Sequence, residues 1–179
     1  MVVMGQSDFY QDVIFSLRKD LAERLDLFYF KYFPDLAHIE KINDEIRQKQ
    51  GIDKILHFKS GESKNIEEKI RDKDYGDILF EEYSNYETKS LGWMLKDQAT
   101  DYLIYVILPK NRLYVFDYPK LKTLFLGNYN NWLLKYDRKM GKTLQNGKLL
   151  YETSNIPVPL TLVKDCIYKS FDLVSTRKY

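Results

Sequence analysis

An aspartate, a glutamate and a lysine lie close together in the segment GIDKILHFKSGESKNIEEKIR, residues 51–71: Asp53 in a first apolar run, and Glu67 and Lys69 in a second. Two carboxylates that converge with a lysine are the groups needed for metal-assisted phosphodiester hydrolysis. The acids would hold Mg²⁺, which keeps several waters and takes a phosphate oxygen as a further ligand. The metal lowers the pKa of a bound water, and the lysine orients that water or stabilises developing charge.

Two strands are expected to position these groups, at residues 52–58 and 65–71, joined by the turn KSGES. Side chains alternate between the faces of a strand, so Glu67 and Lys69 share a face. If the strands pair, that face lies beside the face of Asp53, although the sequence does not fix the register. The prediction of a common site depends on this pairing.

An acid two residues before a lysine is common in so charged a chain. It occurs at Glu62/Lys64, Glu67/Lys69, Glu87/Lys89 and Asp137/Lys139. Only the second pair lies inside an apolar strand that follows another strand with an acid. The competing interpretation is a solvated edge strand decorated with charges.

The rest of the chain is read as helix, strands, helix and a short tail. A helix over residues 7–33 is predicted by apolar residues at intervals of three to four, behind a Ser7 cap and before Pro34. Residues 35–50 are ambiguous: AHIEKI could be a short strand, and NDEIRQKQ could be a helical turn that Gly51 ends.

Further strands are expected at residues 77–83 and 102–108, the latter apolar on both faces like a central strand, with a hairpin to residues 113–116. Helical spacing follows Pro119, the glycines of MGKTLQNGK predict a loop, and a final helix is predicted from Leu160, Val163, Ile167 and Phe171. This order indicates one α/β domain over residues 1–179, with catalytic strands at 51–83, a hairpin and helices at 101–179, and a central mixed β-sheet flanked by helices.

The composition, 44% hydrophobic and 30% charged over 179 residues, is typical of a soluble globular domain. The longest apolar stretch, YLIYVIL, is too short for a membrane span, and the first residues lack a signal-peptide pattern. Cys166 is the only cysteine, which excludes an internal disulfide and a cysteine-based zinc site. We therefore expect a cytoplasmic protein that does not engage a membrane.

Residues 119–150 contain seven basic residues and one acid, although the formal net charge of the chain is only +2. Such a stretch attracts phosphate backbones, and the alternative is a solubilising face. The candidate nucleic-acid contacts are Lys135, Arg138, Lys139 and Lys142, beside the ring of Tyr136.

The run QKQGIDKILHF…NIEEKIRD, with its aspartate, thirteen intervening residues and then E-x-K, resembles the PD-(D/E)XK nuclease superfamily. It is more narrowly similar to restriction-endonuclease-like proteins of phages and mobile elements. The later LGWMLKDQATDYLIYVI also resembles those relatives, whereas Ile52 replaces the proline that names the motif.

The resemblance implies a restriction-endonuclease-like fold, with Asp53 and Glu67 as metal ligands, Lys69 as the catalytic lysine and the main-chain carbonyl of Glu68 as a further ligand. It also implies an acid from the N-terminal region, for which Glu23, Glu40 and Glu45 are the candidates. The expected function is a nuclease that uses Mg²⁺ or Mn²⁺ to hydrolyse DNA, and a homodimer is left open. The alternative is a non-catalytic nucleic-acid- or protein-binding module that keeps the nuclease fold.

One further residue shares the expected Asp53 face. His57 lies four residues along the same strand and is able to reach the metal shell or a phosphate. A lone strand histidine is more often a hydrogen-bonded structural residue, and that role is the one we favour for His57.

Overall fold

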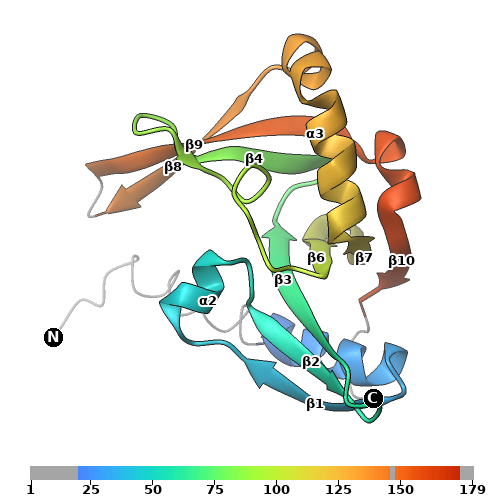
Figure 1. Cartoon of the computed structure of the whole chain (residues 1–179). Helices are drawn as coiled ribbons and strands as arrows, with labels where there is room; N and C mark the ends of the chain where they lie inside the picture. Colours follow the sequence, from blue (N-terminus) through green and yellow to red (C-terminus); the bar gives the residue numbers. More distant parts are fainter. Residues whose placement is uncertain (1–19, 146–147, 174–179) are drawn as a thin grey trace, which may run out of the picture.

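The computed structural model describes residues 20–145 and 148–173, which form an α/β structure with two β-sheets (Figure 1). The large sheet has the strand order β1-β2-β3-β6-β7-β10. Its strands are Leu36–Lys41 (β1), Lys54–Phe58 (β2), Ser63–Arg71 (β3), Tyr102–Ile107 (β6), Arg112–Asp117 (β7) and Ile167–Asp172 (β10). Strands β3 and β6 run parallel and the other neighbours are antiparallel, so the sheet is mixed as predicted.

The small sheet is antiparallel, with the order β5-β4-β9-β8. Its strands are Asp77–Asn85 (β4), Ser90–Leu91 (β5), Lys139–Gln145 (β8) and Lys148–Pro159 (β9). Helices are few: a helix whose described part is residues 20–32, α2 (Glu45–Lys49), α3 (Tyr118–Lys135), and the 3₁₀ turns η1 (Leu108–Lys110), η2 (Leu160–Leu162) and η3 (Lys164–Cys166).

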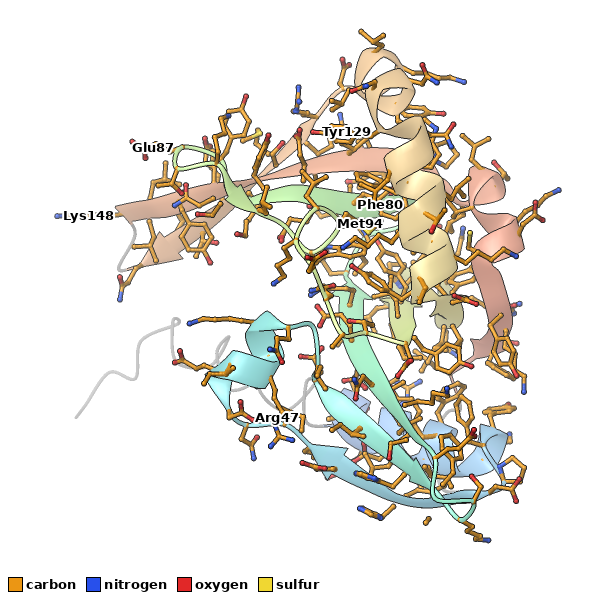
Figure 2. The ribbon with its side chains drawn as sticks, in the orientation of Figure 1. Arg47, Phe80, Glu87, Met94, Tyr129 and Lys148 are labelled. Atoms are coloured by element: carbon orange, nitrogen blue, oxygen red, sulfur yellow. The ribbon has the colours of Figure 1, made fainter. Side chains whose placement is uncertain are left out.

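Two apolar cores lie on opposite faces of the large sheet. The helix of residues 20–32 covers one face through Leu21, Leu25, Phe28 and Tyr29, which pack with Leu56, Ile66, Ile104 and Val106. Helix α3 and the small sheet cover the other face, where Phe80 and Met94 are fully buried (Figure 2). The five residues from Leu103 to Ile107 are 0–2% exposed, so β6 is the doubly covered central strand that its sequence predicts.

Helix α3 begins where the sequence indicates. The Asp117 carboxylate accepts a hydrogen bond from the Lys120 amide, and Pro119 occupies the first turn. Helix α2 is capped in the same way by Asp44, and the chain leaves it through Gly51 at φ 75°, a left-handed conformation that suits glycine.

Two predictions about the C-terminal third are wrong. The expected loop MGKTLQNGK is mostly strand, because β8 pairs with β9 from Lys139↔Asn155 to Gln145↔Lys148. The expected final helix is a pair of 3₁₀ turns followed by β10, which pairs with the edge of β7. The large sheet is therefore covered on one face by a second sheet as well as by α3, and not by helices alone. Residues 7–19 of the predicted first helix lie outside the described residues.

Within the described part of the chain, no helix combines the length and the apolar character that crossing a membrane requires.

Candidate functional site

Asp53 occupies the point where β2 separates from β3. The last residue pair between these strands is Lys54↔Ile66. Just before it, the Asp53 amide donates to the Ile66 carbonyl (2.8 Å), and the Asp53 carboxylate oxygen Oδ2 accepts from the Glu68 amide (2.7 Å). The Asp53 side chain is thus held against the middle of β3 by backbone hydrogen bonds, and Oδ1 has no part in them.

Glu67 is a buried acid on the α3 side of the large sheet. Its register partner in β6 is Leu103, a core residue of that side, and Glu67 is 4% exposed. Burial raises the pKa of the Glu67 carboxyl; the Lys69 ammonium opposes this rise and the Asp53 carboxylate adds to it. The hydrogen bond from the Glu68 amide to Asp53 places the Asp53 carboxylate beside the residue that follows Glu67.

Lys69 lies on the same face of β3 as Glu67, as alternation predicts. Its ammonium forms an ion pair with Glu67, and 35% of the Lys69 side chain is exposed. A second cation, Lys96, also favours the ionised form of Glu67. The structure therefore pairs a buried carboxylate with the partly exposed Lys69, and the charges of Asp53 and Lys96 also act on it.

The Glu68 side chain lies on the opposite face, below the helix of residues 20–32. It accepts from the Tyr29 hydroxyl (2.7 Å) and pairs with Lys54 (2.8 Å), which also pairs with Asp26 (2.9 Å). Lys54 is only 5% exposed, and its partners account for a buried lysine in an apolar core. Burial lowers the pKa of Lys54, but the Glu68 and Asp26 carboxylates outweigh it, so the net direction is upward.

The main chain of Glu68 is placed differently from its side chain. The carbonyl and amide of a strand residue point to the same side. Because the Glu68 amide donates to the Asp53 carboxylate, the Glu68 carbonyl points toward the same edge of β3, beyond the last pair with β2. The expected backbone ligand thus lies on the edge of β3 that Asp53 occupies.

The three N-terminal acids have other surroundings. Glu40 accepts from Arg47 (2.8 Å) and contacts His57 (3.0 Å), Glu45 pairs with Lys49 (3.2 Å), and Glu23 is exposed on its helix. Of the described contacts, none joins these acids to Asp53 or Glu67. The helix acid that reaches the large sheet is Asp26, on the face opposite Glu67.

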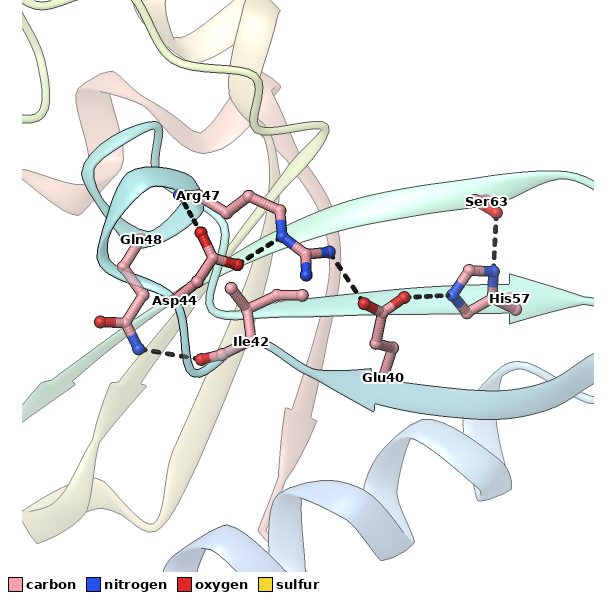
Figure 3. Close-up of polar contacts among 7 residues, drawn as sticks. All are labelled: Glu40, Ile42, Asp44, Arg47, Gln48, His57 and Ser63. Carbon is pink, nitrogen blue, oxygen red and sulfur yellow. Dashed lines mark hydrogen bonds and ion pairs between the residues drawn. The ribbon is translucent and has the colours of Figure 1, made fainter.

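His57 is bound within a cross-strand network (Figure 3). Its Nε2 lies 3.0 Å from the Glu40 carboxylate and its Nδ1 lies 3.0 Å from the Ser63 hydroxyl. The ring also stacks on His38, with the ring centroids 4.3 Å apart. Hydrogen bonds from His57 and Arg47 lower the pKa of Glu40. Both ring nitrogens have protein partners, which supports the structural role that we favour.

The segment before β6 contributes two residues that sequence reasoning missed. Lys96 acts on Glu67, and Gln98 lies against the turn that leads to Asp53. Both amide atoms of Gln98 are buried, and neither has a hydrogen-bond partner among the described residues. A Cβ at Gly51 would lie 2.6 Å from that amide, so glycine is what allows the segment to approach. The sequence signals these two residues only through the polar run KDQAT, which lies between Trp93 and the apolar strand that follows.

The four predicted nucleic-acid contacts lie on or next to the small sheet, but Arg138 is engaged elsewhere. Its guanidinium pairs with Glu82 (2.7 Å), a carboxylate that is 0% exposed and also accepts from Tyr129 and Ser154. Burial raises the pKa of Glu82, but these hydrogen bonds outweigh it and the net direction is downward. Removing Arg138 would leave a buried charge without its counter-ion, so Arg138 has a structural role.

The other three predicted contacts, all lysines, are not bound to a buried carboxylate within the described residues. Lys135 lies over the Tyr136 ring, 5.6 Å from its centroid, and Lys142 is 3.9 Å from Glu152 with 66% of its side chain exposed. Lys139 is exposed at the start of β8 and has no ion-pair partner among residues 20–145 and 148–173. All three side chains are exposed to solvent.

The donors around Glu67 suit a hard cation. Two carboxylates and a backbone carbonyl are the oxygen ligands that Mg²⁺ accepts, with waters completing the octahedron. Burial raises the pKa of Glu67 and the neighbouring Asp53 carboxylate adds to this rise, which gives the site a physical reason to attract positive charge. Across the described residues, three or more histidine, cysteine, aspartate or glutamate side chains nowhere gather into a metal cage, so water and the backbone would supply the other ligands.

Comparison of the chain with protein-family models, curated proteins and solved structures found no match.

Proposed function

We propose that this protein is a metal-dependent nuclease of the PD-(D/E)XK, restriction-endonuclease-like type that hydrolyses phosphodiester bonds of DNA. The observation that supports this most is the placement of Glu67. This carboxylate is 4% exposed, repelled by Asp53 and paired with Lys69 on one face of β3. A mixed sheet with a helix packed on each face is compatible with the proposed fold.

Each group has a distinct task in this proposal. Asp53, Glu67 and the Glu68 carbonyl would hold Mg²⁺ or Mn²⁺, which when bound polarises a phosphate and acidifies a water. The Glu68 amide keeps Asp53 in place through its hydrogen bond. Lys69 is partly exposed at the end of the site. It would orient the attacking water and donate a hydrogen bond to the phosphate oxygen on which negative charge develops. Lys96 adds positive charge behind Glu67.

A cleavage assay tests the proposal. Supercoiled plasmid and labelled single strands are incubated with the protein in Mg²⁺, Mn²⁺ or EDTA. We expect cleavage in either metal and none in EDTA, with Lys69→Ala and Glu67→Gln each losing about 10²-fold or more in rate. Comparable cleavage by Lys69→Ala would contradict the proposal.

Matched controls come from the same strand and its turn. Lys64 lies on the opposite face of β3, and Glu62 is exposed in the turn before it, so Lys64→Ala and Glu62→Gln repeat the chemical changes outside the site. Both variants should retain the wild-type rate. Salt-sensitive DNA binding without cleavage in either metal would instead support the non-catalytic module.

A further inference from the structure

A cavity of about 1010 Å³ opens at the C-terminal end of β3. One wall is formed by residues 70–73 and 75–77, where β3 turns into β4. The other wall comes from the end of α3 and from the small sheet, through Tyr136, Lys139–Gly141, Pro157 and Pro159. This volume equals the upper range of small-molecule pockets and is ample for one nucleotide.

Exposed rings and apolar groups face this cavity. Tyr75 is 69% exposed, and its ring lies over the Arg71 guanidinium, 5.7 Å from the ring centroid. Ile70 and Met140 are 46% and 40% exposed, and Tyr136 lines the opposite wall. A flat ring with an open face in a wide cavity is suited to stacking on a planar ligand.

The cavity also offers positive charge that the protein does not neutralise. Neither Lys73 nor Lys139 has an ion-pair partner in the described part of the chain. Arg71 is already paired with Asp77, and Asp72 is the remaining acid of the lining. Two free ammonium groups beside exposed rings form the combination that binds single-stranded nucleic acid, where rings stack on bases and lysines follow the phosphates.

The cavity begins one residue beyond Lys69 on β3, because Ile70 and Arg71 line it. Glu67, Lys69 and Arg71 occupy alternate positions of one strand face, so Lys69 and Arg71 are about 7 Å apart along β3. That distance is about two nucleotide rises of a stacked strand. In a duplex the bases are paired and stacked on one another, so only an unpaired base has a face free for Tyr75.

We propose that this cavity binds an unpaired nucleotide of single-stranded DNA, or of a single-stranded branch, one or two nucleotides from the phosphate at Lys69. The inference rests on the proposed nuclease function and assigns its substrate: DNA with an unpaired segment in preference to a continuous duplex. Tyr75 stacks on the base, and Lys73 and Lys139 contact the adjoining phosphates.

Binding in EDTA tests this without cleavage. Anisotropy of a fluorescein-labelled oligothymidylate is compared with that of a fully paired duplex, for wild type, Tyr75→Ala and Tyr75→Trp. We expect Tyr75→Ala to weaken single-strand binding about 5- to 150-fold and to leave duplex binding unchanged, whereas Tyr75→Trp retains it. Lys73→Ala should reduce the slope of log K against log salt by about 0.7.

The matched control is Tyr168→Ala, since Tyr168 is also an exposed tyrosine (53%) but lines a separate, smaller cavity. It should bind the single strand like wild type. Tyr75 is mostly exposed, so its variants keep the wild-type melting temperature, which circular dichroism checks.

The outcomes separate the two proposals. Metal-dependent cleavage with equal single-strand affinity in wild type and Tyr75→Ala would overturn the cavity assignment and leave the nuclease intact. Single-strand binding that depends on Tyr75, without cleavage in either metal, would support the cavity assignment and contradict the nuclease proposal. Tighter binding of an RNA oligonucleotide than of DNA would overturn the choice of DNA.

Discussion

Glu67 is the residue at which stability and the proposed chemistry oppose each other. A carboxylate that is 4% exposed and close to Asp53 disfavours its own ionisation, and Lys69 and Lys96 only partly compensate. Residues that cost folding energy yet occupy a polar site are characteristic of functional positions. This conflict leads to one prediction for pH and one for divalent cations.

The first concerns the pH dependence of stability. Because the pKa of Glu67 is raised on folding, the folded state binds this proton more tightly than the unfolded chain does. The stability of the protein therefore falls as pH rises from the ordinary glutamate pKa of 4.5 through the higher folded pKa, because Glu67 becomes ionised while buried. The melting temperature of Glu67→Gln relative to wild type should be higher at pH 7 than at pH 4. A difference that is constant with pH would contradict the burial of this charge.

The second prediction concerns the metal. Mg²⁺ or Mn²⁺ bound between Asp53 and Glu67 stabilises the folded state by mass action, and a hundredfold excess over Kd corresponds to about 5–10 °C in melting temperature for a protein of this size. Thermal scans with and without the cation should show this rise for wild type and for Glu62→Gln. Asp53→Asn and Glu67→Gln should not respond, and an equal rise in all four would place the cation elsewhere.

At the scale of elements, the site depends on the contact between the turn before β2 and the segment before β6. The Gln50 and Gly51 carbonyls accept from the Ala99 amide (2.9 Å) and from the Thr100 hydroxyl (2.7 Å). Gly51 is in the left-handed region, and its Cα approaches the Gln98 amide. The position of Asp53 is thus fixed by two elements that are far apart in sequence.

Gly51→Ala should disturb this contact. Left-handed backbone costs a non-glycine residue about 1–2 kcal/mol, and the added methyl also collides with Gln98 and Thr100. Gly61→Ala is the control, because Gly61 has φ 88° but nothing within 4 Å of an added Cβ. Denaturant unfolding should show the larger loss for Gly51→Ala, and only that variant should also lose cleavage. Equal losses would show that Gly51 contributes backbone conformation alone.

The same elements show what the sequence was able to predict. Alternation along β3 correctly placed Glu67 and Lys69 on one face of the sheet and Glu68 on the other. Apolar cores on both faces hold this strand in its register. The pairing of Asp53 with the middle of β3 depends on where β2 begins, at Lys54, which no residue of the sequence indicates. Lys54 has the appearance of a surface residue, and only the long-range partners Asp26 and Glu68 explain its burial.

The C-terminal errors have a related cause. The apolar residues from Leu160 to Phe171 match helical spacing, yet β7 has a free edge, and pairing with β10 satisfies its backbone groups. In the predicted loop, Gly141 is required by packing, since a Cβ there would lie 2.5 Å from the Thr153 hydroxyl across the hairpin. Local patterns cannot reveal either long-range contact.

At the scale of the whole molecule, the proposed chemistry is on the large sheet and much of the free positive charge is on or beside the small sheet. Lys135 and Lys142 are exposed on α3 and β8, and neither lines the cavity beyond β3. A substrate that contacts both would cross from one sheet to the other. Long-range attraction by these lysines should therefore act on every DNA substrate, paired or unpaired.

The double variant Lys135→Ala/Lys142→Ala should bind duplex and single-stranded DNA more weakly by a similar factor. The slope of log K against log salt should fall by about 0.7–0.9 for each phosphate that a lysine no longer neutralises. Lys59→Ala, an exposed lysine beside the smaller cavity, should leave the slope unchanged. An unchanged slope in the double variant would show that these lysines form a solubilising surface.

The most direct measurement is the position of a divalent cation in crystals soaked with Mn²⁺, located by anomalous scattering. We predict one peak between the Asp53 and Glu67 carboxylates, about 2.1 Å from an oxygen of each, with the Glu68 carbonyl or waters completing the shell. Crystals of Glu67→Gln should lack that peak. Saturating Mn²⁺ with no density between the two carboxylates, in a protein that still cleaves DNA, would contradict this account.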